Sequence, residues 1–207
     1  MLTNPPPPRI QARMTLDCPD ELDAARTGDG VAYGRLVARH QRAVFQLCWR
    51  ITRDEALAED AAQEAFTKAW RALPEFDGRA AFGTWLHRIA VNAALEQLRR
   101  NARHREALGE SLLDGDADGE AAIPFLSTLD DDAPGPQDHA HAGELRQRIG
   151  AELSRLSGLE RAAFVLRHVE GEPLETIAAT LSLNIGQSKQ AIFRAVRKLR
   201  GALQDWR

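Results

Sequence analysis

The sequence predicts an all-α fold made of two small helical domains joined by an acidic flexible linker. Apolar residues recur at three- and four-residue steps on both sides of the middle of the chain, and no stretch alternates convincingly enough to indicate a strand. Between these parts, residues 106–143 are rich in Asp, Glu, Gly and Pro and have little helical periodicity. Near the C-terminus, a short turn joins two helical patterns, the second of them basic, as in a helix-turn-helix motif.

These observations divide the chain into four segments. Residues 1–17 are Pro-rich and polar and predict a disordered tail, in which Met14 is an alternative start. Residues 18–105 predict the first helical domain, residues 106–143 the linker, and residues 144–207 the second helical domain.

The charge of the chain is distributed unevenly. The formal net charge is −3, but residues 106–144 hold 11 Asp or Glu and no Lys or Arg, which leaves 19 acidic and 27 basic residues, a balance of +8, in the remainder. The folded parts are therefore basic, as expected of a nucleic-acid-binding protein. Cys18 and Cys48 lack the paired spacing of a zinc site, no apolar run is long enough to span a membrane, and the N-terminus lacks the apolar region of a signal peptide. We expect a cytoplasmic protein with no cofactor, no metal site and no direct membrane insertion.

Helical patterns follow one another through the first domain. They cover residues 19–27, 30–52, 54–73 and 80–103, and Asp54 is a suitable N-cap for the third. The apolar stripe of the third pattern is made by Leu57, Ala61, Ala65, Phe66, Ala69 and Leu73, and that of the fourth by Phe82, Leu86, Ile89 and Ala93.

The third pattern also carries a polar patch on the side away from its apolar stripe. Asp60, Gln63, Glu64 and Thr67 fall at helical spacing, so two carboxylates and an amide are expected to face outward together. Taken alone, this patch also fits an ordinary solvated helix face, because exposed acidic residues are common.

The fourth pattern combines a basic face with nearby aromatic residues. Aromatic rings interleaved with Arg suit bases lifted out of a duplex, because any base can stack on a ring and Arg neutralises phosphates. Each aromatic residue also fits a place in the hydrophobic core. The basic face holds Arg88, Asn92, Arg99 and Arg103, and the aromatic residues are Phe76, Phe82 and Trp85.

Two sequence runs in this region have the pattern of a known protein family. Residues 60–66 read DAAQEAF, and residues 69–92 read AWRALPEFDGRAAFGTWLHRIAVN. Together they closely resemble region two of bacterial RNA polymerase sigma factors of the extracytoplasmic-function (ECF) subfamily. In that family the first helix docks on the clamp helices of core RNA polymerase, and the loop and following helix open and hold the minus-ten promoter element.

The resemblance implies roles for individual residues. Core polymerase would be bound by Asp60, Gln63, Glu64 and Thr67, and the single-stranded minus-ten DNA by Phe76, Asp77, Gly78, Arg79, Trp85, Arg88, Asn92 and Arg99. Gly83 and Val91 depart from the family pattern, which usually has basic residues there, so phosphate contacts at these two positions are not implied.

In the second domain, the last two helical patterns begin at Pro173 and after a turn at residues 182–184, where Asn184 is a natural N-cap. One face of the last helix, residues 185–203, is free of acidic residues and rich in amide and basic groups, which suits base edges and phosphates in a DNA major groove. A solvated basic face is the alternative. The candidate DNA-binding residues are Gln187, Lys189, Gln190, Arg194, Arg197 and Lys198, with Arg200 on a flank.

Residues 156–199 also resemble region four of the same family, which reads the minus-thirty-five element as a duplex. This match is looser. Gln187 and Ser188 replace the usual Thr-Val pair, and Ala191 stands where Arg is frequent, so the family's base preference does not transfer.

The acidic linker has two interpretations. It fits a solubilising spacer, and the resemblance implies a path through the active-site cleft and RNA exit channel of polymerase, with residues 123–126 as an apolar anchor. His139 and His141 lack a third ligand for a metal site.

The sequence thus favours a promoter-specificity subunit of bacterial RNA polymerase, bound to core polymerase and promoter DNA and, as is usual in the family, controlled by an anti-sigma factor. The alternative is a helix-turn-helix regulator that does not bind core polymerase. An enzyme is disfavoured because the sequence has no phosphate-binding loop and no GxSxG motif.

Overall fold

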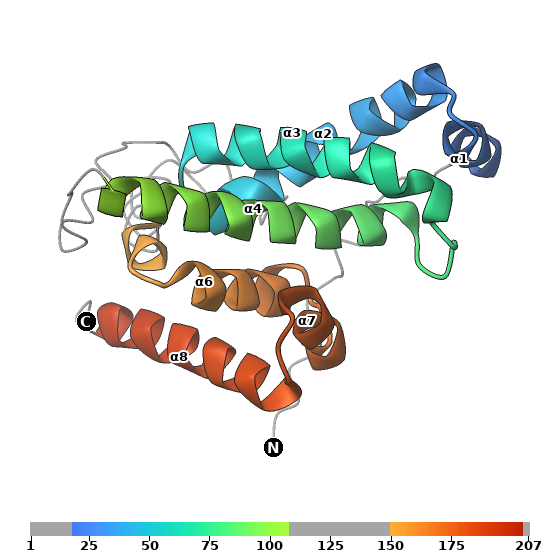
Figure 1. Cartoon of the computed structure of the whole chain (residues 1–207). Helices are drawn as coiled ribbons and strands as arrows, with labels where there is room; N and C mark the ends of the chain where they lie inside the picture. Colours follow the sequence, from blue (N-terminus) through green and yellow to red (C-terminus); the bar gives the residue numbers. More distant parts are fainter. Residues whose placement is uncertain (1–17, 108–149, 205–207) are drawn as a thin grey trace, which may run out of the picture.

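A computed structural model of the chain describes residues 18–107 and 150–204 (Figure 1). Over these residues the all-α prediction is confirmed, because they form helices and connecting turns without a strand. The predicted N-terminal tail, nearly all of the acidic linker, the apolar island at residues 123–126 and both linker histidines lie outside the described residues.

The first half of the chain is a bundle in which α2, Gly30–Thr52, α3, Glu55–Ala72, and α4, Phe82–Ala107, pack on one another, with α1, Pro19–Arg26, against α2. A 3₁₀ turn, Leu73–Glu75, follows α3. These bounds agree with the predicted helices to within a few residues.

Side-chain caps begin two of these helices. The Asp29 carboxylate accepts hydrogen bonds from the N–H groups of Val31 and Ala32 at 2.8 and 3.1 Å, and the Asp54 carboxylate accepts one from Leu57 at 2.9 Å, as the sequence predicted for Asp54. Alanines at positions 58, 61, 65 and 69 give α3 a narrow, fully buried edge, which lets the neighbouring helices approach closely.

The second half contains helical residues 150–154 and then α6, Gly158–Phe164, which continues as a π-helical turn, Val165–Val169. Next come α7, Leu174–Leu181, and α8, Ile185–Gln204, joined by a tight turn through Ser182, whose φ is 54°. This pair is the predicted helix-turn-helix. The second half has a small core of its own, made by Leu153, Leu156, Ala195 and Leu199.

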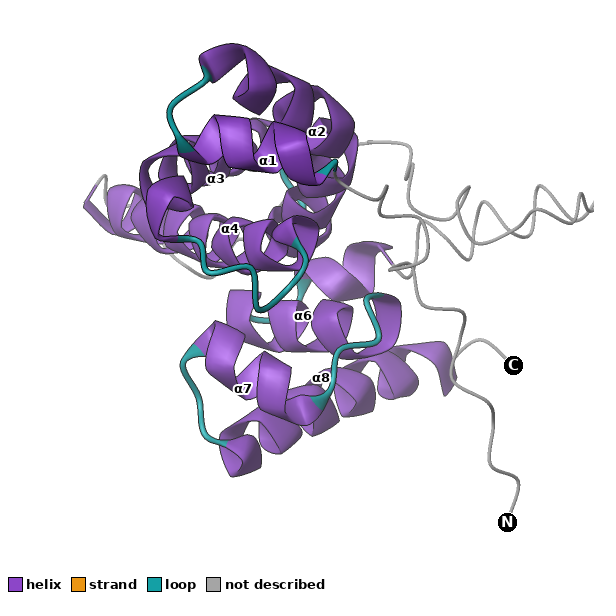
Figure 2. Cartoon of the chain, turned by 90° about the vertical axis from the view of Figure 1, so that its right-hand side faces the viewer, coloured by secondary structure: helices purple, strands orange, loops and turns teal. Residues whose placement is uncertain are grey.

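The two halves are in contact. In both views α6 lies beside α4 (Figures 1 and 2), and one continuous hydrophobic core includes residues of both halves, among them Leu86 and Leu95 of α4 and Ala162, Val165 and Ile177 of the second half. The sequence did not predict this contact, because helical periodicity says which face is buried but not against which partner.

Among residues 18–107 and 150–204, no helix combines the length and the apolar character that crossing a membrane would need.

Candidate polymerase and nucleic-acid interfaces

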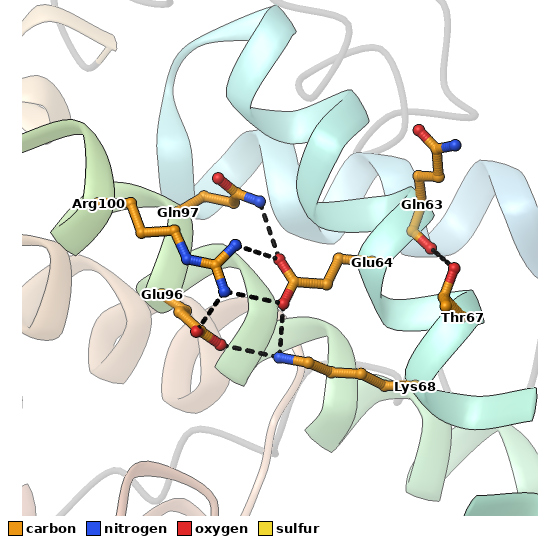
Figure 3. A network of polar contacts seen from close by, with 7 residues as sticks. All are labelled: Gln63, Glu64, Thr67, Lys68, Glu96, Gln97 and Arg100. Atoms are coloured by element: carbon orange, nitrogen blue, oxygen red, sulfur yellow. Dashed lines mark hydrogen bonds and ion pairs between the residues drawn. The ribbon is translucent and has the colours of Figure 1, made fainter. Parts of the chain in front are cut away.

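The outward stripe of α3 presents Asp60, Gln63 and Thr67, which are all exposed. The Thr67 hydroxyl donates a hydrogen bond to the Gln63 carbonyl oxygen at 2.9 Å, while the Gln63 amide points away from the neighbouring polar network (Figure 3). The carboxylate of Asp60 and the amide of Gln63 therefore face solvent and are available to a partner.

Glu64 is placed differently, and the expectation that it faces outward with this stripe is wrong. Its carboxylate, 18% exposed, turns toward α4 and accepts hydrogen bonds from Gln97 Nε2 at 2.8 Å and from an Arg100 terminal nitrogen at 3.2 Å (Figure 3). Lys68 Nζ lies 2.7 Å from Glu64 Oε1 and 2.8 Å from Glu96 Oε2. Glu64 is thus held by the cationic and amide groups around it, and it joins α3 to α4.

The ionisation of the network agrees with this arrangement. Hydrogen bonds to Glu64 and Glu96 raise the pKa of Lys68, and hydrogen bonds from Lys68 and Arg100 lower the pKa of Glu96. The network thus sets the two carboxylates of Glu64 and Glu96 against the two cations of Lys68 and Arg100 at the surface.

Trp70 extends the stripe of Gln63 and Thr67 by one turn, and the sequence analysis did not include it. Its ring is 37% exposed and packs against Tyr33 at a centroid distance of 4.7 Å. The signal was the spacing 63, 67, 70, which places Trp70 on the outward face, and a partly exposed Trp is a frequent anchor at protein interfaces.

The aromatic residues around the loop form a packed cluster. The ring centroids of Phe76 and Phe82 lie 5.0 and 5.7 Å from that of Trp85, and Phe76 and Phe82 are only 5% and 2% exposed. The ring of Phe76 therefore lies in the core, which is the alternative that the sequence left open, and its contact with minus-ten DNA stays a prediction. Trp85 is only partly buried.

The loop itself projects polar groups. The Asp77 carboxylate accepts a hydrogen bond from the Arg79 N–H at 3.0 Å, and Gly78 between them has a φ of 71°, a conformation that favours glycine. The Arg79 side chain is 89% exposed. The outer face of α4 continues this surface with the exposed residues Arg88, Asn92 and Arg99.

The predicted N-cap of α8, Asn184, is confirmed. It forms hydrogen bonds with Gln187, one of the candidate base-reading residues. The Asn184 side-chain oxygen accepts a hydrogen bond from the Gln187 N–H at 2.8 Å, and Gln187 Oε1 accepts one from the Asn184 N–H at 2.9 Å. Lys189, Gln190, Arg194 and Arg197 are exposed, as the sequence predicted.

Phe193 lies on the same exposed face, 65% exposed, and the sequence analysis missed it. Its spacing from Gln190 and Arg197 was the available signal. An apolar side chain on such a face suits contact with a thymine methyl group.

Glu160 of α6 partly compensates the positive charges of Arg194 and Lys198 on α8. Glu160 of α6, 7% exposed, lies with its carboxylate 2.7 Å from Lys198 Nζ and 3.6 Å from Arg194 Nε. Although burial raises it, hydrogen bonds from Lys198 and from the Ser157 cap leave the pKa of Glu160 below its ordinary value. Lys198 therefore also joins α8 to α6.

The described residues hold no group of three or more His, Cys, Asp or Glu side chains arranged to bind a metal ion.

Comparison with known families places both surfaces in one class of protein. Residues 36–104 match sigma-70 region 2, and residues 146–199 match sigma-70 region 4. These are the parts that carry the α3 and α4 surfaces and the α8 surface, so the fold and the site define a bacterial sigma factor.

Full-length relatives define the family more closely. The chain is 34% identical over 184 residues to the RNA polymerase sigma-H factor of Pseudomonas aeruginosa, a match that covers 88% of this chain and 92% of the relative. It is 33% identical over 175 residues to the ECF RNA polymerase sigma-E factor of Escherichia coli, covering 84% and 87%. The chain belongs to the ECF sigma factor family and, as a member of it, functions in transcription initiation.

Solved structures agree with the fold. A structure of CnrH in complex with the cytosolic domain of CnrY is 26% identical, with a TM-score of 0.55 over 90% of this chain and 96% of CnrH. The sigma factor RpoE of Bartonella quintana, in complex with the anti-sigma factor NepR, is 21% identical and shares the fold with a TM-score of 0.61 over 83% and 96%.

Proposed function

We propose that the surfaces of this ECF sigma factor divide the work of promoter opening. The exposed stripe of α3, with Asp60, Gln63, Thr67 and Trp70, docks on core RNA polymerase. The residue 77–79 loop, the exposed part of Trp85 and the α4 face hold the unstacked minus-ten strand, while α8 reads the minus-thirty-five duplex. The observation that carries this proposal is the presence of both surfaces on one chain, which an unrelated helix-turn-helix regulator does not require.

The mechanism is binding rather than bond chemistry. Unstacking a base costs a few kcal/mol, which contacts to the flipped base offset. Because these contacts exist only with the open strand, the sigma factor shifts the promoter toward the open form by differential affinity. The protein acts in the cytoplasm, where polymerase and promoter DNA meet, and an anti-sigma factor is a further partner, as NepR is for RpoE of Bartonella quintana.

The test concerns the exposed amide of Gln63 on α3. We expect Gln63→Ala to weaken the complex with purified core polymerase by about tenfold or more, or roughly 1.4 kcal/mol, without changing stability, because its amide is exposed and makes no tertiary contact. Gln41→Ala, which removes an exposed amide from α2, is the matched control and should bind normally. Binding is measured by competition against a labelled sigma factor.

Two results would count against the proposal. Equal polymerase affinity of Gln63→Ala and Gln41→Ala would remove α3 from the docking surface. Absence of any complex between the wild-type chain and core polymerase would favour the regulator that acts on DNA alone.

A further inference from the structure

Glu160 of α6 lies next to α8 and is fixed by the cap of its own helix. The two helices lie side by side in both views (Figures 1 and 2). The Ser157 hydroxyl accepts a hydrogen bond from the Glu160 N–H at 3.3 Å, and Glu160 Oε2 accepts one from the Ser157 N–H at 3.2 Å. This reciprocal capping box, together with the burial of Glu160, holds the carboxylate in one position.

The same carboxylate pairs with two neighbouring cations of α8. Glu160 Oε2 accepts a hydrogen bond from Lys198 Nζ at 2.7 Å, and Glu160 Oε1 lies 3.6 Å from Arg194 Nε. Lys198 follows Arg194 by four residues, so the two side chains lie on one side of the helix. Because Oε2 is occupied by Lys198 and by the Ser157 N–H, Oε1 is the oxygen that Arg194 meets.

The contact engages the Nε edge of the Arg194 guanidinium group. The Arg194 side chain is 58% exposed, and within residues 18–107 and 150–204 its two terminal nitrogens form no hydrogen bond. Two parallel N–H groups of an arginine are what recognises guanine, through O6 and N7 in the major groove. Since the guanidinium group is planar, a contact at Nε also restrains the plane of the terminal nitrogens. The pair with Glu160 therefore restrains Arg194 while leaving its base-reading nitrogens available.

Other basic residues of α8 are not held in this way. Lys189, Arg197 and Arg200 are exposed, and none of them forms an ion pair within the part of the chain that the structure describes. A long side chain loses rotamer freedom when it binds, and one that is already restrained loses less. Phosphate contacts carry no sequence information, whereas a bidentate base contact needs one geometry. Arg194 is thus the α8 cation best prepared for a base contact.

We propose that Glu160 is a positioning residue, which holds Arg194 for bidentate recognition of one guanine in the minus-thirty-five element. This inference rests on the proposed function, because it requires α8 to read that element. Glu160 itself touches no DNA and acts through Arg194. Lys198 balances its negative charge, so the carboxylate adds little repulsion toward the phosphates. Glu160 therefore increases the specificity for a base more than the affinity for DNA.

The test uses holoenzyme reconstituted from the full chain and core polymerase. The probe is a promoter at which the wild-type holoenzyme starts transcription, randomised across its minus-thirty-five element. Bound and unbound duplexes are sequenced, which gives the base preference at each position. Arg194→Ala should abolish a guanine preference of about tenfold or more at one position. Glu160→Gln keeps the side-chain shape and a residue type that the capping box accepts, and it should reduce the same preference by at least about threefold.

Two comparisons separate positioning from a structural role. Glu160→Gln removes a negative charge near the DNA surface, so affinity for duplexes without the guanine should stay equal or rise, while affinity for duplexes with the guanine falls. Glu175→Gln removes an exposed acid of α7 and is the control for the change in charge; it should leave the guanine preference intact. In an Arg194→Ala background, Glu160→Gln should have no further effect on base preference, because it acts only through Arg194.

Several results would overturn the inference. A guanine preference in Glu160→Gln equal to that of the wild type would show that the carboxylate does not position Arg194, and a stronger preference would show that it holds Arg194 away from DNA. An equal loss of affinity for all duplexes would limit Glu160 to the stability of the second half. A guanine preference that survives in Arg194→Ala would assign the base contact to another residue. If the wild-type holoenzyme has no base preference in the upstream element, the proposed function of α8 itself fails, whatever Glu160 does.

Discussion

The two halves of the molecule bury their apolar side chains in different ways. The first half forms a bundle with large side chains that are fully buried, such as Leu36, Leu47 and Leu86. The second half has a small core of its own and places Val165 and Ile177 in the core that it shares with the first half. The first half is therefore the more self-sufficient unit, and the second draws part of its burial from the contact between them.

The polar surfaces show a common device in both halves. Glu64 of α3 holds Lys68 and the α4 residue Arg100, and Glu160 of α6 holds Lys198 of α8. In each half a glutamate on one helix pairs with basic groups next to a proposed binding surface. The groups that remain exposed on these surfaces are the ones that we propose for contact with polymerase or DNA.

The largest expected effect tests how far the second half depends on the first. Leu47→Ala, at a fully buried position, should cost about 2–5 kcal/mol of stability, because it leaves a cavity in the bundle. Amide hydrogen exchange should show faster exchange in α7 as well as in α2, because α7 packs on the shared core through Ile177. Leu153→Ala, in the small core, is the comparison and should affect the second half alone. Unchanged protection of α7 in Leu47→Ala would mean that the halves are stable independently.

Lowering the pH should reduce the stability of the protein by a smaller amount, through a histidine of the first half. Burial, with the nearby His40 and Arg50 side chains, lowers the pKa of His87 to about 4. Because the pKa in the unfolded chain is higher, the stabilising contribution of neutral His87 is complete above that ordinary value and is lost as the pH falls toward 4. The loss at pH 5 should be about 2 kcal/mol, measured by urea unfolding between pH 7 and 5.

Carboxylates also titrate in this range, so the control is His87→Gln, which cannot gain the charge. Its stability should fall less between pH 7 and 5 than that of the wild type. Parallel pH profiles of the two proteins would show that His87 is not buried as a neutral group.

The smallest effect concerns the start of α8. Asn184→Ala removes the acceptor for the Gln187 N–H and should cost about 1 kcal/mol, mainly in the second half. Asn184→Asp keeps a capping acceptor and should retain most of the stability. The two variants are compared by thermal unfolding, and equal losses would show that the cap contributes nothing.

Much of this architecture follows from local rules that the sequence contains. The 3.6-residue period located α2, α3, α4 and α8, and capping chemistry correctly placed Asp54 and Asn184. The same local rules put Glu64 on an outward patch. This was wrong because the side chain reaches across to Arg100, 36 residues later, and no local pattern encodes that contact.

Phe76, in the loop between α3 and α4, is a second residue whose surroundings local patterns did not predict. The sequence left open whether its ring stacks on DNA bases or lies in the hydrophobic core. In the structure the ring packs on Phe82 and Trp85 of the following helix, a contact that no local pattern predicts.

The sequence by itself determined where the helices begin and end, which face of each is apolar, and which family the chain belongs to, because these depend on neighbours three or four residues away and on continuous motifs. Tertiary structure alone decided which polar groups remain exposed and that the halves close on each other through Arg50 and Glu170. Those outcomes depend on side chains far apart in the sequence, whose charge and burial balance only once the helices have packed.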